Sequence, residues 1–286
     1  MRPRLNARRK VAVGAAVAAL ALVGWAVLVE PGRVSVRTVD LSLPGWPAAL
    51  DGLRVAVMGD IHAGAPHVDV DSLRALVADV NRASPDVVVL LGDYVIHGVV
   101  GGRFVEPEIT AGILGGLRAP GGVVAVLGNH DWWYDGTRIR RALEARGIVV
   151  LENETHRAVR DGNPFWFAGI ADLWTRHPDI EGTLAGIPPG EPVLLLTHSP
   201  DVFPDVPARV AVTLAAHTHG GQVRLPPFPP PVVPSQYGSR YAAGHVVEGG
   251  RHLFVTTGVG TSILPVRFAV PPEVVILVLR SGPPSR

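Results

Sequence analysis

The chain has 286 residues, of which 47% are hydrophobic, and it carries 26 basic and 25 acidic side chains, for a formal charge of +1. This composition excludes a mostly disordered chain, and the balanced charge provides no basic field of the kind that attracts nucleic acid, so no nucleic acid partner is indicated. Because cysteine is absent, disulfides, thiolate nucleophiles and cysteine-bound zinc are excluded, and any metal ion must be held by His, Asp, Glu or Asn.

A basic segment and a long uncharged run stand at the start of the chain. Residues 1–10 carry five cations and form a basic tail, whereas residues 11–29 carry no charge. The uncharged run is long enough to cross a bilayer and longer than the apolar core of a typical secretory signal, so we expect an uncleaved transmembrane signal-anchor over residues 11–29.

The cations favour the cytoplasmic side, which predicts a single-pass protein of the inner or cell membrane with everything after Val29 on the extracytoplasmic side. A cleaved signal, a twin-arginine export signal at Arg8 and Arg9, and a buried core helix are the alternatives.

The rest of the chain has the composition of an α/β protein, and we expect residues 30–50 to form a linker and a first strand, 51–280 a single domain, and 281–286 a C-terminal tail. Helical periodicity predicts helices over 70–82 and 137–146. Continuous apolar runs, typical of strands buried on both faces, occupy residues 53–58, 87–91, 123–127, 193–196 and 210–215, and later runs at 252–256 and 274–279 predict further strands.

Residues that can bind metal follow each of the first five runs at once. They are Asp60, His62, Asp93, Asn129, His130, Asp131, His198, His217 and His219. A single Gly-Asp after a strand is usually only a turn, but five such strand ends in order favour one shared crevice, because ligands of α/β sheets gather beyond the carboxyl ends of the strands. Asp93 is the candidate for a carboxylate shared by two divalent ions, and the nitrogen-rich set suits Mn, Fe, Zn or Co.

In chain order, the motifs Asp60-x-His62, Gly92-Asp93, Gly128-Asn129-His130-Asp131, His198 and His217-Thr218-His219 resemble the signature of the calcineurin-like metallophosphoesterases. The segments 220–226, 258–260 and 264–268 resemble the membrane-associated bacterial branch called YkuE-like or YaeI-like. The resemblance covers most of the chain after residue 34. It implies a metallophosphoesterase domain over 51–280, built as a four-layer α/β/β/α sandwich of two mixed sheets, with the transmembrane helix before it.

The same resemblance implies roles for the strand-end residues. Asp60, His62 and His219 would bind a first metal ion, Asp93 would bridge, and Asn129, His198 and His217 would complete the second site. His130 would lie over the substrate and assist the leaving group, with Asp131 orienting its ring. The implied reaction is hydrolysis of a phosphodiester or phosphoanhydride by a metal-bridging hydroxide. Ala216 departs from the family pattern, which usually has Gly there.

Substrate contacts and alternative functions are less constrained by the sequence. Arg224, Arg240 and Arg267 are candidate phosphate-binding residues, and His97 is the most ambiguous of the other histidines because it lies close to Asp93 in sequence. Beside a membrane, the phosphoester substrate would be lipid-linked, cell-wall-linked or a nucleotide.

Two alternative functions remain. One is a lipid pyrophosphatase of the UDP-2,3-diacylglucosamine type, whose substrate is cytoplasmic and so conflicts with the predicted orientation. The other is a non-catalytic metal-binding module, which would have no need of His130 and Asp131.

Overall fold

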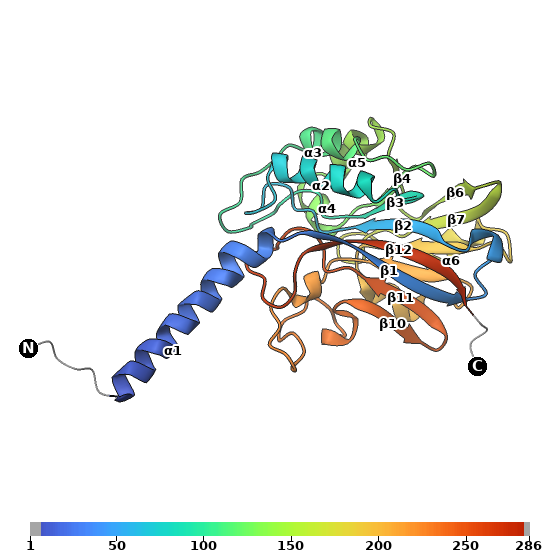
Figure 1. Ribbon diagram of the computed structural model, residues 1–286. Coiled ribbons are helices and arrows are strands. Elements are labelled where there is room, and N and C mark those ends of the chain that lie inside the picture. The colour runs from blue at the N-terminus through green and yellow to red at the C-terminus, as the bar shows by residue number, and fades with distance from the viewer. Residues whose placement is uncertain (1–6, 283–286) are drawn as a thin grey trace, which may run out of the picture.

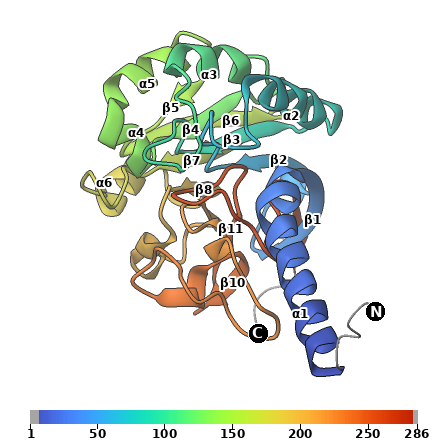
Figure 2. The same cartoon turned by 90° about the vertical axis from the view of Figure 1, so that its left-hand side faces the viewer.

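Two six-stranded sheets pack face to face in the computed structural model, which describes residues 7–282 (Figure 1). Residues 1–6 of the expected basic tail and residues 283–286 of the expected C-terminal tail lie outside the described residues. The first sheet is covered by α2 (Val70–Arg82), α3 (Pro107–Leu114) and α5 (Gly136–Glu144), as Figure 2 shows from a second side. The outer face of the second sheet is covered by α6 (Ile180–Ala185) and the 3-10 helix η4 (Pro200–Asp205). The predicted four-layer sandwich is confirmed.

The first sheet is parallel except where β12 meets β2. Its strands, in spatial order, are β1 (Ser35–Pro44), β12 (Glu273–Gly282), β2 (Leu53–Met58), β3 (Val87–Leu91), β4 (Val123–Val126) and β5 (Val149–Val150). The C-terminal strand β12 thus lies between the two earliest strands, so the two ends of the domain are held by the same sheet.

The second sheet has a parallel centre and antiparallel edges. Its order is β10 (Gly244–Glu248), β11 (Arg251–Val255), β9 (Val212–Ala215), β8 (Val193–Leu196), β7 (Asn163–Gly169) and β6 (Glu154–Arg160). The five apolar runs of the sequence are strands β2, β3, β4, β8 and β9. The hairpin of β6 and β7 was not predicted, because its exposed face interrupts the apolar pattern.

Short helices join these strands, and the helix α2 covers 70–82 as predicted. Asp69 caps α2 by accepting a hydrogen bond from the Ser72 backbone N–H at 2.8 Å, and its buried face is Leu73, Leu76, Val77 and Val80. The remaining short elements are α4 (Asn129–Tyr134), η3 (Ala48–Leu50), η5 (His219–Gly221) and η6 (Gly238–Tyr241).

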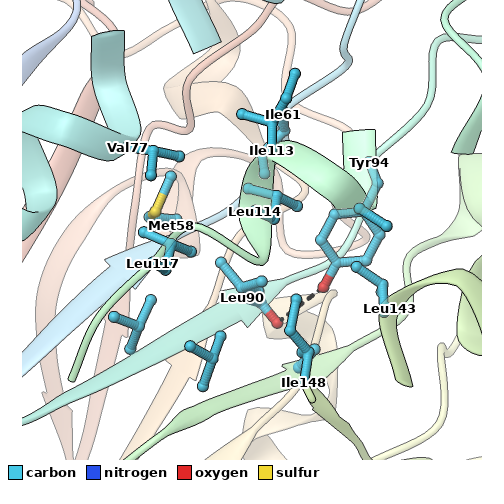
Figure 3. Packing of buried hydrophobic residues seen from close by; sticks show 14 of the residues in the cluster. Met58, Ile61, Val77, Leu90, Tyr94, Ile113, Leu114, Leu117, Leu143 and Ile148 are labelled. Carbon is cyan, nitrogen blue, oxygen red and sulfur yellow. Dashed lines mark hydrogen bonds between the residues drawn. The ribbon is translucent and has the colours of Figure 1, made fainter. Parts of the chain in front are cut away.

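Buried side chains form one layer between the sheets and one on each outer face. Figure 3 shows the layer under α2, α3 and α5, where Leu90 and Tyr94 pack among aliphatic side chains. The Tyr94 hydroxyl donates to the Val126 carbonyl at 2.8 Å, so its polar atom is satisfied inside the core. This layer fixes the carboxyl ends of β3 and β4.

The N-terminal helix α1 (Ala7–Gly24) projects away from the domain (Figures 1 and 2). It continues as the π-helix η1 (Trp25–Val29) and the 3-10 helix η2 (Glu30–Gly32). Within the span Ala7–Gly32, an 18-residue stretch has a mean hydropathy of 2.4 and is almost entirely exposed, so the helix is long and apolar enough to cross a membrane. A buried core helix, one of the alternatives, does not fit this exposure.

Candidate metal centre

The nine strand-end residues predicted from the sequence lie together at the carboxyl ends of five strands. Residues 60 and 62 follow β2, residue 93 follows β3, residues 129–131 open α4 after β4, residue 198 follows β8, and residues 217 and 219 follow β9. None of them is more than 6% exposed. All five strands belong to the parallel parts of the two sheets, so their carboxyl ends, and with them the site, lie at one edge of the sandwich.

Unusual backbone conformations hold this cluster. Five of the candidate ligands have φ between 44° and 70°, in the left-handed region that costs a non-glycine residue energy, namely Asp60, His62, Asp93, His217 and His219. Gly128 makes room for Asp93, because a Cβ at position 128 would lie 2.2 Å from Asp93 Oδ1. Such strain and crowding persist only where the surrounding structure enforces them, and they gather at functional sites.

The first group of candidate ligands is Asp60, His62 and His219, whose ligand atoms lie within 4.8 Å of one another. Nε2 of His62 lies 3.2 Å from Nε2 of His219, and Nε2 of His219 lies 4.0 Å from Oδ2 of Asp60. The other nitrogen of His62 faces the Val95 carbonyl at 3.2 Å, which fixes the orientation of the ring.

The second group is Asp93, His198 and His217, within the same 4.8 Å limit. Nε2 of His198 lies 3.2 Å from Nδ1 of His217 and 3.0 Å from Oδ1 of Asn129. Nδ1 of His198 faces the Leu91 carbonyl at 2.7 Å, so Nε2 is the nitrogen that points into the cluster.

Asp93 joins the two groups through one carboxylate oxygen. Its Oδ2 lies 3.3 Å from Nε2 of His198 and 3.6 Å from Nε2 of His62. Its Oδ1 accepts a hydrogen bond from the His130 backbone N–H at 2.9 Å. The carboxylate is therefore anchored by one oxygen, and its other oxygen lies between the two groups.

The donor set fits divalent metal ions. Oδ2 of Asp60, which lies 4.0 Å from Nε2 of His219, is buried and has no hydrogen-bond partner among the described residues. In addition, two pairs of imidazole nitrogens face each other at 3.2 Å, although neutral imidazoles carry lone pairs that repel when no proton lies between them. A buried cluster of lone pairs is a good binding site for a borderline cation such as Mn, Fe, Co or Zn.

Burial and Asp93 set the charge state of the cluster. Burial lowers the pKa of His62 and of His217 to about 3, so both rings are neutral, as metal ligands must be. Burial also lowers the pKa of His198, but the Asp93 carboxylate raises it more, to about 10. Burial raises the pKa of Asp60 to about 7. In the metal-free cluster, His198 is therefore protonated and carries a positive charge that offsets the Asp93 carboxylate.

His130 lies beside the cluster, and Asp131 does not orient its ring. Nε2 of His130 is 4.0 Å from Oδ2 of Asp93, and Nδ1 of His130 has no hydrogen-bond partner among residues 7–282. Both oxygens of Asp131 instead accept backbone N–H groups, from Asp93, Tyr94 and Gly128 at 2.8 to 2.9 Å. The expected orienting role is therefore wrong, because Asp131 lies at the third position of α4 and points back into the turn that precedes it.

The three arginines do not gather at the site. Arg267 is fully buried, and its guanidinium donates to the carbonyls of Val270, Thr257, Gly258 and Gly260. The prediction that it binds phosphate is wrong, since backbone groups already occupy its terminal nitrogens. Arg240 pairs with Glu248, and Arg224 donates to the Phe228 carbonyl in an exposed loop, so their predicted roles gain no support from their contacts.

Several residues around the site were missed or left open by the sequence analysis. Trp133 and His97 lie beside His130, with ring centroids 4.9 Å and 6.1 Å from its ring, and Trp174 lies 4.9 Å from the ring of His217. Asp172 is buried near the cluster. It follows the strand β7, so the same rule that found the other strand ends would have found it if that strand had been recognised.

Comparison with known proteins agrees with this geometry. The profile of the calcineurin-like phosphoesterases matches residues 53–221, the stretch that holds all nine strand-end residues, from Asp60 to His219. The fold and the site define a phosphoesterase of this class, and the chain belongs to the calcineurin-like phosphoesterase family.

Its relatives fall in the predicted YkuE-like and YaeI-like branch. The chain is 30% identical to the metallophosphoesterase YkuE of Bacillus subtilis over 90% of each protein, and 30% identical to the phosphodiesterase YaeI of Escherichia coli over 79% of this chain and 82% of that one. It is also 30% identical to a zebrafish (Danio rerio) transmembrane protein with a metallophosphoesterase domain, covering 92% of this chain and 62% of the relative. The apolar helix and such membrane-protein relatives indicate membrane anchoring.

Proposed function

We propose that the chain is a dinuclear-metal-dependent phosphodiesterase, which hydrolyses phosphodiester or phosphoanhydride bonds. The observation that carries the proposal is the position of Asp93, with Oδ2 at 3.6 Å from His62 and 3.3 Å from His198. A carboxylate shared in this way is what two closely spaced cations need to offset their repulsion. The relation to YaeI, which is named a phosphodiesterase, supports a diester substrate.

Two groups of residues would hold the metal ions, Asp60, His62 and His219 on one side and Asn129, His198 and His217 on the other, with Asp93 between them. When bound, divalent ions lower the pKa of water and neutralise the charge of a phosphoryl group. Asn129 contributes a neutral oxygen, which leaves only two carboxylates, Asp60 and Asp93, among the seven ligands. The low ligand charge keeps such a pair of ions electrophilic.

His130 is placed to act on the leaving group. Its ring packs edge-on against His62 with the centroids 4.7 Å apart, and burial lowers its pKa. A phosphate group beside the ring would favour the protonated form again, since an opposite charge stabilises the imidazolium. His130 would then donate a proton or a hydrogen bond to the departing oxygen.

The proposal is tested with a panel of substrates: bis-p-nitrophenyl phosphate, p-nitrophenyl phosphate and pyrophosphate, each with Mn²⁺ and with a chelator. We expect hydrolysis that needs metal and is fastest for the diester, and loss of activity in Asp93→Asn, which keeps the shape of the side chain but loses the charge. Turnover of pyrophosphate alone would favour a pyrophosphatase instead. Absence of any metal-dependent turnover would leave a metal-binding module.

We further propose that α1 anchors the chain with the catalytic domain on the extracytoplasmic side, where its phosphoester substrate would be lipid- or cell-wall-linked. Support comes from Arg8, Arg9 and Lys10, which lie at the start of a helix that carries no other charge before Glu30. External protease added to spheroplasts should digest the domain, and a domain that resists digestion until the cells are lysed would reverse the orientation.

A further inference from the structure

The end of the N-terminal helix is fixed to the catalytic domain. The Ala26 carbonyl accepts the Arg267 backbone N–H at 2.9 Å, and the Val27 carbonyl lies 2.9 Å from Nε2 of His67. The buried carboxylate of Glu30 accepts the Val270 backbone N–H at 2.9 Å. Contacts from three residues of the helix end to two different loops hold the helix and the domain in one orientation.

These contacts indicate where the surface of the bilayer lies relative to the domain. Ala26 and Val27 belong to the uncharged run 11–29, which is expected to lie in the hydrocarbon. Trp25 lies at the same level, and the Arg33 guanidinium stacks on its ring at 5.3 Å, a pair typical of the membrane interface. The loop segments that touch residues 26–30 must therefore lie at the interface as well.

The loops that meet there expose apolar side chains. We name as the apolar rim seven residues that are between 42% and 73% exposed: Val100, Phe104, Leu225, Phe228, Val232, Ile263 and Leu264. Hydrogen bonds connect their three loops, since the Val100 N–H donates to the Ile263 carbonyl at 2.9 Å and the Gln222 side chain donates to the Leu264 carbonyl at 3.3 Å. Ile263 and Leu264 precede Arg267, whose N–H binds the helix end.

Figure 1 shows the loops between η5 and β10 and between β11 and β12, drawn in orange to red, on the side of the domain from which α1 leaves. Figure 2 shows the same loops beside the root of α1. Scattered exposed apolar residues are ordinary, but seven on connected loops around one helix end form a patch of the kind that contacts a partner or a membrane.

The charge of these loops indicates which kind of surface they contact. The segments 97–105, 222–235 and 257–272 contain no Asp or Glu, in a chain that has 25 of them, and they carry the exposed cations Arg103 and Arg224. Apolar side chains flanked by arginine and free of carboxylates suit the surface of a bilayer with anionic headgroups.

We propose that the apolar rim inserts into the surface of the bilayer that holds α1, so that the chain contacts the membrane through its catalytic domain as well as through its helix. The rim adjoins the metal centre, because the Phe104 ring packs on Tyr134 of α4 with centroids 4.8 Å apart and Gln222 follows His219 by three residues. The face that carries the metal centre is therefore held close to the membrane surface.

The absence of cysteine allows a direct test on the full-length chain. Single-cysteine variants Phe228→Cys, Val232→Cys and Ile263→Cys carry a nitroxide label and are reconstituted into vesicles of equal parts phosphatidylcholine and phosphatidylglycerol. Val159→Cys is the matched control, since Val159 is 46% exposed on β6, at the far side of the domain from α1 (Figure 1). Collision of each label is measured with oxygen, which concentrates in lipid, and with a water-soluble nickel chelate.

We expect the ratio of oxygen to nickel collisions to be several-fold higher at the rim positions than at position 159. Labels at the rim that are as accessible to nickel as the label at 159 would overturn the proposal. The proposal would also be overturned if the rim labels were shielded from both reagents and their spectra showed spin-spin broadening. That result would indicate that a second copy of the chain covers this face. Because no catalytic turnover is measured, these outcomes are independent of the proposed activity. A rim variant whose circular dichroism spectrum differs from that of the parent chain is replaced by Leu264→Cys.

Discussion

The backbone N–H of Asp93 donates to Oδ2 of Asp131 at 2.8 Å, and the same oxygen accepts the Gly128 N–H at 2.9 Å. Asp131, which was expected to orient the ring of His130, thus holds the loop after β3 against the loop after β4. In return, Oδ1 of Asp93 accepts the His130 N–H at 2.9 Å. These hydrogen bonds fix the position of the Asp93 carboxylate, which we propose to bridge two metal ions.

Asp131→Asn should weaken the hydrogen bonds between these two loops. An amide has one acceptor oxygen and presents an NH₂ group where Asp131 accepts N–H donors, so at least one buried N–H is left without a partner, at a cost of about 1–3 kcal/mol. We expect the free energy of unfolding, measured with urea, to fall by about that amount and metal affinity to fall with it. If the stability of the variant were unchanged and only its pH profile of catalysis were altered, Asp131 would orient His130 after all.

His130→Asn should separate catalysis from metal binding. The variant should keep the metal content of the parent and lose about 10²- to 10⁴-fold in kcat, the range of general acid catalysis. The loss should grow with the pKa of the leaving group across a series of aryl diesters. His97→Asn, which changes a ring farther from the cluster, is the control with a smaller effect. Loss of a metal ion from His130→Asn by elemental analysis would make His130 a ligand, not a proton donor.

Gly128→Ala should displace Asp93. The added methyl group would lie 2.2 Å from Oδ1 of Asp93 and 2.8 Å from the ring of His198, so the loop must shift, and metal affinity and activity should both fall sharply. Gly112→Ala on α3 is the matched control, since its methyl group would have 3.8 Å to its nearest neighbour and should stabilise the helix by about 0.5–1 kcal/mol. A Gly128→Ala protein with full metal content would refute the close packing described for this loop.

The metal-free protein should lose stability as the pH rises from 6.5 towards 10. The pKa of His198 lies at about 10 in the folded chain against 6.5 as its ordinary value, so the folded state binds more protons in this window and its stability is lost as the pH rises through it. Asp60, with a pKa of about 7, adds a loss of the same sign up to neutral pH. The low pKa values of His62 and His217 act only below 6.5.

Urea midpoints at a series of pH values measure this dependence. His198→Gln should flatten it, and metal loading should remove it, because a coordinated His198 is neutral. A metal-free protein that becomes more stable between these pH values would show that the Asp93 carboxylate does not stabilise the protonated form of His198.

Local signals in the sequence predicted the buried strands and the cluster at their ends, whereas the two-sheet sandwich was implied by the family resemblance. Each ligand directly follows an apolar run, so its place at a strand end can be read from a few residues, as for Asp93 after Val87–Leu91. Asp172 was not predicted because the strand before it, β7, is only partly buried and does not have the continuous apolar pattern of a buried strand.

The roles that were wrong depend on partners distant in sequence or on side-chain direction. Arg267 is buried because carbonyls at 257–260 and a turn at 270 surround it, and no local pattern distinguishes it from an exposed arginine. The direction of Asp131 follows from its place in the first turn of α4, which required the exact start of that helix. The contact of Ala26 with Arg267 joins residues 241 positions apart and could be seen only in the structure.

The central claim is that seven side chains hold two divalent ions and that both are needed for hydrolysis of a diester. The most direct test titrates the metal-free protein with Mn²⁺ while bound metal and hydrolysis of bis-p-nitrophenyl phosphate are followed together. The account predicts no turnover without metal, and activity that reaches its plateau only when two ions are bound per chain. Full activity with a single ion bound, or two ions bound without turnover, would contradict it.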